Sequence, residues 1–210
     1  DSISVIGNEA LAHCEGLTNI TIDTHVVSIG DETFNTCLNL SSVTIPASVR
    51  NIGRLAFESC FALQSVSIAN GVTNIGERAF SLCTSLGSIS LPASVQALGA
   101  SLFASCSSLS NITVVAANQN YKSSGGVLFN KSQTTLIQFP AAKTGDYAVP
   151  IGVTAIGVSA FEGAALLSVT LTESTTTIGA YAFSSCLNLT NATLGSGVCD
   201  IPDYAFRNCI

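Results

Sequence analysis

Hydrophobic residues recur along the chain with a period of 23 residues, and most positions between them are polar or small. The bulkiest position of the repeat is occupied by Leu11, Phe34, Phe57, Phe80, Phe103, Phe161, Phe183 and Phe206. An isoleucine or leucine stands five residues earlier in each repeat, and in seven of them a cysteine stands three residues later. A unit of this length cannot bury its apolar side chains alone, so the pattern predicts stacked coils that share one core.

Each repeat also contains a segment in which apolar and polar residues alternate, such as residues 40–45. This alternation and the β-branched residues predict a short strand, and equivalent strands of successive coils must run parallel. The Ile-Gly pair predicts a second short extended segment. The residues around the phenylalanine are too few for an α-helix and predict a single helical or 3-10 turn.

Residues 115–149 interrupt the period. Within them, Val127–Phe129 and Thr135–Phe139 predict the two strands of a β-hairpin, because apolar residues alternate along both. We therefore expect residues 1–210 to form a single solenoid of about eight coils with one hairpin insertion. Because neither end has a polar capping repeat, we also expect this solenoid to belong to a longer chain.

The repeat reads V-x-x-I-G-x-x-A-F-x-x-C-x-x-L-x-x-V-x-I, as in the consecutive units SVTIPASVRNIGRLAFESCFALQSVSIANGVTNIGERAFSLCTSL. This pattern resembles the BspA-like, treponemal-type leucine-rich repeat. The resemblance implies a right-handed leucine-rich repeat superhelix with a parallel β-sheet on its concave face, short turns and extended segments on its convex face, and a β-hairpin insertion. It further implies a cell-surface or secreted protein that binds other proteins through repeats without enzymatic activity.

Composition and charge exclude several partners. Charged residues make up only 10% of the chain, and the net charge is −6. Binding to nucleic acid or to an anionic membrane surface requires a basic patch, so we expect neither partner. No apolar run of about 18 residues is present, so this segment is not expected to insert into a membrane.

The cysteines and histidines offer little chemistry. We expect seven cysteines, at equivalent repeat positions, to be buried free thiols: Cys14, Cys37, Cys60, Cys83, Cys106, Cys186 and Cys209. Their parallel Cβ directions suit disulfides poorly, and an odd number cannot all pair. No cluster has metal-ligand spacing, so no metal or cofactor is expected. Although His13 adjoins Cys14, the same cysteine recurs in other coils without a histidine, and no catalytic residue is expected.

Two groups of residues are candidates for ligand binding. The first is a row of small hydroxyl side chains on the solvent side of the strands, which we call the hydroxyl row: Thr21, Thr44, Ser67, Ser90, Thr113, Thr170 and Thr193. The second consists of Tyr121, Lys122, Lys131 and Lys143, which lie in the insertion but outside its apolar face. Both groups also have a purely structural interpretation, in which the hydroxyls favour strands and the insertion covers the edge of the solenoid.

We therefore expect a protein-recognition or adhesion module. Two other functions remain open. In the first, the array is a structural spacer that displays other domains. In the second, the hydroxyl row binds carbohydrate.

Overall fold

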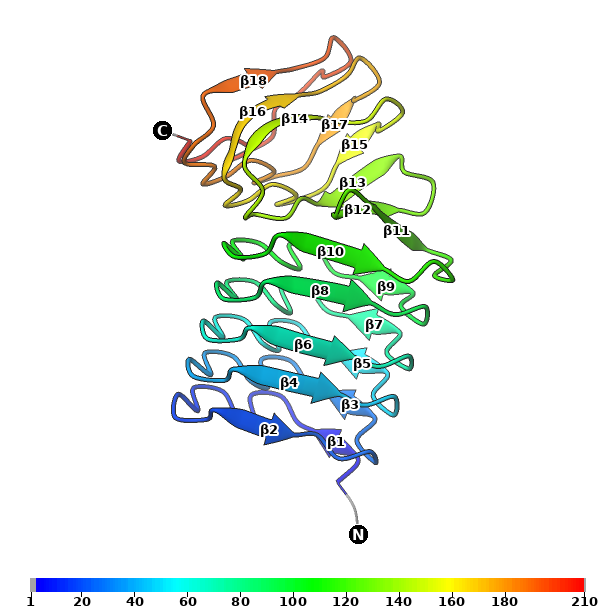
Figure 1. Cartoon of the computed structure of the whole chain (residues 1–210), viewed down its shortest axis with the longest axis vertical. Helices are drawn as coiled ribbons and strands as arrows, with labels where there is room; N and C mark the ends of the chain where they lie inside the picture. The colour runs from blue at the N-terminus through cyan, green and yellow to red at the C-terminus, as the bar shows by residue number, and fades with distance from the viewer. Residues whose placement is uncertain (1–2, 210) are drawn as a thin grey trace.

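The computed structural model describes residues 3–209, which form a solenoid of about eight coils (Figure 1). No residue in this range lies in an α-helix or a 3-10 helix, and all regular structure consists of short strands. Most strands pair in parallel with the equivalent strand of the next coil. The predicted repeat solenoid is thus confirmed.

The Ile-Gly segments form a parallel sheet along one side of the first five coils. Its strands are β1 (Val5–Ile6), β3 (Ser28–Ile29), β5 (Asn51–Ile52), β7 (Asn74–Ile75) and β9 (Ala97–Leu98). Equivalent residues are in register, so that Ile29, Ile52 and Ile75 stack directly upon one another. This sheet ends at β9.

The alternating segments form longer strands on an adjacent side of each coil. They are β2 (Asn19–Thr21), β4 (Ser42–Ile45), β6 (Ser65–Ile68), β8 (Ser88–Leu91) and β10 (Asn111–Val114). In β4, Val43 and Ile45 are buried whereas Ser42 and Thr44 are exposed, as the alternation predicts. The hydroxyl row therefore lies on the outer face of these strands.

A third connection between coils runs through what we call the turn segments, from the glycine of Ile-Gly to the cysteine, such as residues 53–60. In most of them, N–H groups of alternate residues donate to carbonyls of the next coil, as from Phe57 to Ala79 at 2.8 Å. Leu55 and Ser59 adopt positive φ angles of 56° and 60°. The predicted helical turn is therefore wrong: a helix directs its N–H groups along its own axis, whereas these cross to the next coil.

The phenylalanines form a column inside the solenoid. The ring centroids of Phe34 and Phe57 are 5.0 Å apart, and those of Phe57 and Phe80 are 5.3 Å apart, with nearly parallel planes. All three side chains are fully buried. Stacking at this distance stabilises the core beyond simple area burial.

Eight strands follow β10 in the described residues, and the first four of them lie within the irregular region. The first six are β11 (Tyr121–Ser124), β12 (Val127–Asn130), β13 (Thr135–Gln138), β14 (Gly145–Ala148), β15 (Ala155–Ile156) and β16 (Leu166–Thr170). The last two strands of the chain are β17 (Thr177–Ile178) and β18 (Asn191–Thr193). The hairpin strands expected from the sequence are present as β12 and β13, which pair antiparallel, and β11 pairs antiparallel with β12.

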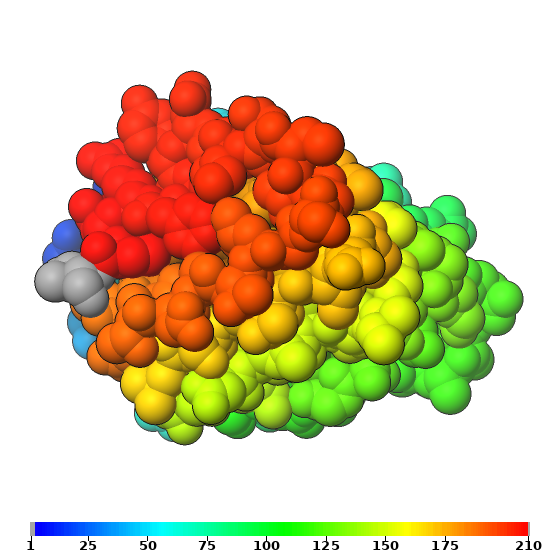
Figure 2. All heavy atoms as spheres, turned by 90° about the horizontal axis from the view of Figure 1, so that it is seen from above, coloured from blue at the N-terminus to red at the C-terminus, as the bar shows by residue number. Residues whose placement is uncertain are grey.

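Strand β12 separates two parts of the hydrophobic core. Leu128 packs with the first five coils, whereas Val127 and Phe129 pack with the C-terminal coils. Both faces of this strand are consequently buried. Viewed from the C-terminal end, the green segment of the chain, which includes β10 and β11, projects beyond the C-terminal coils (Figure 2).

Residues 135–148, in the second half of the irregular region, form a coil of the solenoid that is shorter than the others, which we call the shortened coil. Strand β13 pairs in parallel with β15, and β14 pairs in parallel with β16. Only residues 139–144 connect β13 to β14, whereas residues 53–64 make the equivalent connection between β5 and β6. This shortened coil therefore has no room for a complete turn segment.

Candidate functional site

The hydroxyl row is exposed and ordered by strand register. Thr21, Thr44 and Ser67 are register partners on β2, β4 and β6, and Ser90 pairs with Thr113 on β8 and β10. All are exposed. Within residues 3–209, only the Thr113 hydroxyl in this set makes a hydrogen bond, to the Ile89 carbonyl at 3.3 Å. The other hydroxyls are free to bond an external group.

A parallel row of amides and hydroxyls lies two residues before the hydroxyl row. Its members are Asn19, Ser42, Ser65, Ser88, Asn111, Ser168 and Asn191. At the shortened coil this row contains Asp146, whose carboxylate accepts a hydrogen bond from the Ser168 hydroxyl at 2.6 Å. The two rows make this face polar and nearly uncharged.

The shortened coil divides the hydroxyl row into two parts. Thr170 and Thr193 are register partners on β16 and β18, but Thr170 pairs on its other side with Ala148 of β14. Strands β2, β4 and β6 form one sheet and β8 and β10 form another, and β6 lies in contact with β8, so the five hydroxyls on β2 to β10 lie along neighbouring strands and make one surface. Thr170 and Thr193 form a second, smaller one. The regular spacing of the sequence did not reveal this division.

Tyr121 is held within the scaffold. Its hydroxyl accepts a hydrogen bond from the Leu98 N–H at 3.1 Å and lies 3.4 Å from the Gln96 carbonyl. Leu98 belongs to β9, the last strand of its sheet, so the tyrosine occupies a position that the next strand would take. Burial raises the pKa of Tyr121 above its ordinary value.

The three candidate lysines, Lys122, Lys131 and Lys143, lie at different places in the insertion. The Lys131 ammonium donates to the Asn118 carbonyl, which fixes it locally. Lys122 projects from the face of β11 opposite Tyr121. The Lys143 side chain passes Gly126 next to Asn111 of β10, at the end of the hydroxyl surface. Within residues 3–209, no lysine forms a salt bridge.

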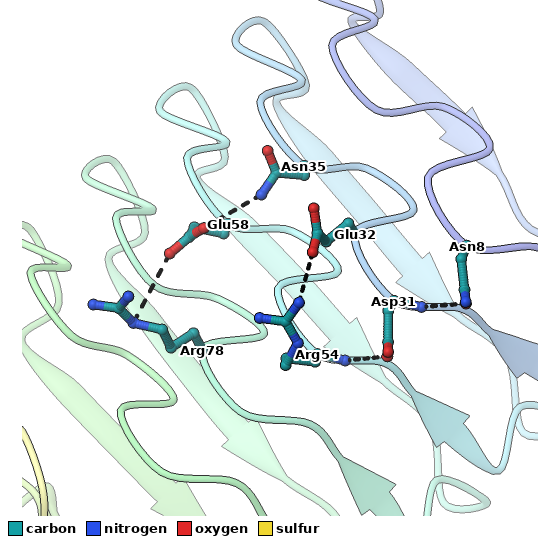
Figure 3. A network of polar contacts seen from close by, with 7 residues as sticks. All are labelled: Asn8, Asp31, Glu32, Asn35, Arg54, Glu58 and Arg78. Atoms are coloured by element: carbon teal, nitrogen blue, oxygen red, sulfur yellow. Dashed lines mark hydrogen bonds and ion pairs between the residues drawn. The ribbon is translucent and has the colours of Figure 1, made fainter.

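Some charged side chains of the turn segments form polar contacts between successive coils (Figure 3). Arg54 Nη2 lies 2.7 Å from Glu32 Oε1, and the Arg54 N–H donates to Asp31 Oδ1 at 2.7 Å. Glu58 lies 4.0 Å from Arg78, and burial raises the pKa of this glutamate. These contacts join successive coils.

The cysteines are structural. Cys37, Cys60, Cys83, Cys106 and Cys186 are buried as predicted, whereas Cys14 and Cys209 are half-buried because they lie in the outermost described coils. All eight thiols are free, and Cys199 is exposed. Burial raises the pKa of Cys60, Cys106 and Cys186 to about 12, so these thiols are poor nucleophiles.

The described residues show no constellation for metal chemistry or membrane crossing. No group of three or more His, Cys, Asp or Glu side chains in residues 3–209 is arranged to hold a metal ion. His13 is exposed, and His25 Nδ1 lies 2.6 Å from Asp23 Oδ1. Nor does this range contain a helix long and apolar enough to cross a bilayer.

Comparison with known proteins agrees with this architecture. The model of the BspA type leucine-rich repeat region matches residues 4–134 and 137–210, in six copies. No protein with a curated description matches the chain.

Several solved structures are similar. A leucine-rich cell surface protein of Faecalibacterium prausnitzii A2-165 is 34% identical, with a TM-score of 0.91; the match covers 99% of this chain and 55% of that one. The pneumococcal vaccine antigen PcpA is 27% identical, with a TM-score of 0.88, over 93% of this chain and 49% of that one. A Treponema pallidum leucine-rich repeat protein is 24% identical, with a TM-score of 0.51 over 91% of this chain and 75% of that one, and shows likeness of fold alone.

The chain thus spans about half the length of the first two of these relatives. Its repeat columns, its parallel coils and the family match over nearly its whole length all agree. The chain belongs to the BspA-type leucine-rich repeat family.

Proposed function

We propose that this solenoid is a protein-recognition module of a bacterial cell-surface protein, and that the hydroxyl surface on β2 to β10 contacts the partner. The observation that carries this proposal is the difference between the strand face, which bears the hydroxyl surface, and the face formed by the turn segments. In the turn segments Arg54 forms a close ion pair with Glu32, whereas in the hydroxyl surface on β2 to β10 all hydroxyls are exposed and, within residues 3–209, only that of Thr113 is hydrogen-bonded. The description of the Faecalibacterium prausnitzii relative as a cell surface protein supports the proposed location.

The chemistry of this face suits a partner that offers backbone or amide groups. Each hydroxyl both donates and accepts hydrogen bonds, and the in-register rows present these groups at regular intervals. Lys143, beside Asn111, adds at one end a positive charge that forms no salt bridge within residues 3–209, in a chain whose net charge is −6. An acidic group of the partner is therefore expected near β10, because complementary charges orient binding partners.

Two matched substitutions test the surface. Ser67→Arg places a large cation in the middle of the hydroxyl surface, and Gln96→Arg places the same cation on the exposed residue before β9. Binding to a panel of purified matrix proteins, such as fibronectin and laminin, is measured for both variants and for the parent chain. We expect Ser67→Arg to weaken binding about tenfold or more, because it disrupts packing at the centre of the contact, and Gln96→Arg to leave it unchanged.

Thermal melting serves as the control, since both substituted positions are exposed and both variants should melt like the parent. If the two variants bind equally well, the hydroxyl surface is not the contact. If the parent chain binds none of the proteins, the spacer function becomes the better explanation.

A further inference from the structure

The shortened coil leaves a gap in the ladder of turn segments. In regular coils, N–H groups of alternate residues in this segment donate to the next coil. In the turn segment of residues 99–106, the Ser105 N–H still reaches the Glu162 carbonyl at 3.2 Å. The Ser101 and Phe103 N–H groups have no acceptor within residues 3–209. Two backbone donors are therefore unsatisfied where the missing turn segment would lie.

A polar cavity with a volume of about 440 Å³ occupies this gap. Glu77, Arg78 and Ser101 line it from the first five coils, and residues between 158 and 208 line it from the C-terminal coils. Its size lies within the range of about 300–1,000 Å³ that is usual for small-molecule sites. It is separate from the hydroxyl surface, which lies on the strands.

Three serines in the cavity wall have hydroxyls that make no hydrogen bond within residues 3–209. They are Ser101, Ser159 and Ser184, which are 8%, 2% and 5% exposed. Ser81, at the position equivalent to Ser184, instead donates to the Ala104 carbonyl. None of the three oxygens is a buried atom without a partner, a condition met within residues 3–209 only by Ser48 Oγ, so the three hydroxyls are accessible from the cavity and free to bond a polar molecule there.

The charges around the cavity restrict what that molecule is. Arg78 and Arg207 both line it, and a guanidinium binds a carboxylate with two parallel hydrogen bonds. Arg78 is only loosely engaged by Glu58, at 4.0 Å, and the Arg207 guanidinium lies 5.4 Å from the centre of the Tyr204 ring. Arg78 thus has no close ion pair within residues 3–209, and the cation–π contact of Arg207 with Tyr204 uses the face of the guanidinium, so its in-plane N–H groups can still bind a ligand.

Glu77 and Glu162 also line the cavity, so it is not simply an anion site. Their carboxylates accept hydrogen bonds from hydroxyl groups and repel a second negative charge. Tyr181, which stacks on Tyr204 with ring centroids 5.0 Å apart, adds an aromatic wall. The wall thus suits one carboxylate together with several hydroxyl groups.

We propose that this cavity binds a small sugar acid. Its carboxylate is held by Arg78 and Arg207, and its hydroxyl groups bond to Ser101, Ser159, Ser184 and the two glutamates. The binding site exists because residues 139–144 are too few to fill the turn side of the shortened coil.

Calorimetric titration of the intact chain tests the ligand class, with sodium glucuronate and sodium galacturonate as probes and glucose and acetate as comparison compounds. We expect at least one uronate to bind about tenfold more tightly than glucose or acetate, because neither of these offers both a carboxylate and a set of hydroxyls. The proposal is overturned if neither uronate binds at millimolar concentration, or if glucose or acetate binds equally well.

Substitutions then test the position of the site. Arg207→Gln, on an exposed residue, should weaken uronate binding about tenfold, and Ser159→Ala combined with Ser184→Ala should do the same. Arg54→Gln removes an arginine that lies on the turn segments outside the cavity, and it should leave binding unchanged. Melting curves verify folding. Equal binding by Arg207→Gln and the parent chain would place the ligand elsewhere and overturn the proposal.

Discussion

The Cys60 thiol donates a hydrogen bond to the backbone carbonyl of Phe34, one coil earlier, with 3.2 Å between sulfur and oxygen. Both residues are fully buried. The same bond recurs between Cys83 and Phe57 at 3.2 Å and between Cys106 and Phe80 at 3.0 Å. The repeated cysteine therefore fills space in the core and also satisfies a carbonyl that water cannot reach.

Substitution of Cys60 separates these two roles. Cys60→Ala leaves a small cavity and removes the donor, so we expect the free energy of unfolding to fall by about 1–2 kcal/mol. Cys60→Ser keeps a donor and should cost less than the alanine variant. Urea unfolding at pH 7 measures both, with an unchanged m-value as the control for two-state behaviour. Equal losses in the two variants would show that the thiol acts through volume alone.

The buried thiols also predict how stability depends on pH. A cysteine ordinarily has a pKa of 9.0, whereas burial raises the pKa of Cys60, Cys106 and Cys186 to about 12. Below pH 9 these thiols are protonated in both the folded and the unfolded state, so they add no pH dependence to the free energy of unfolding. Between pH 9 and 12 the unfolded chain loses protons that the folded chain retains, so the free energy of unfolding falls as pH rises.

Thermal melting between pH 7 and 11 measures this dependence. We expect the melting temperature of the Cys106→Ala variant to decrease less above pH 9 than that of the parent chain, because one of the perturbed thiols is removed. Cys199→Ser changes an exposed thiol, so the melting temperature of this variant should decrease above pH 9 as much as that of the parent chain. A parent melting temperature that stays constant up to pH 11 would contradict the prediction.

Leu82 tests the left-handed turn segments. It has a φ of 60° and is 36% exposed. Leu82→Ala and Leu82→Gly lose the same side-chain contacts beyond Cβ, but only glycine adopts this φ without strain. We expect the glycine variant to be more stable than the alanine variant by about 1 kcal/mol, measured by urea unfolding. The opposite order would indicate that these residues do not have positive φ in solution.

We expect the contact between the Tyr121 hydroxyl and the Leu98 N–H to contribute to stability. Tyr121→Phe removes the hydroxyl that accepts the Leu98 N–H and leaves that donor without its partner. We expect a loss of about 1 kcal/mol in the free energy of unfolding. Lys122→Ser, one residue along the same strand, makes no such contact and should melt like the parent. Hydrogen exchange at Leu98 gives a direct readout, because its amide should exchange faster only in the phenylalanine variant.

Much of the fold followed from the sequence because a repeated unit has one simple way to bury its apolar side chains. The column of phenylalanines, the buried cysteines and the alternation in segments such as Ser42–Ile45 all predicted stacked coils with parallel strands. The hairpin strands β12 and β13 were also predictable, since their apolar residues alternate.

The turn segments were not predictable from residue types. Positions with positive φ are occupied by residues such as Glu32, Leu55 and Arg78, none of which signals a left-handed conformation. This backbone persists because neighbouring coils accept its N–H groups, and such partners lie more than twenty residues away in the chain. Local propensity contains no information about them.

The candidate sites divide in the same way. The sequence by itself determined that the hydroxyl row is exposed, because side chains alternate along each strand. Only the tertiary structure decided that β14 interrupts this row, that the Tyr121 hydroxyl binds Leu98, and that Ser101 faces a cavity. Each of these depends on which segments pair after the repeat is broken, and the pairing is determined by hydrogen bonds between distant strands rather than by the residues of either strand alone.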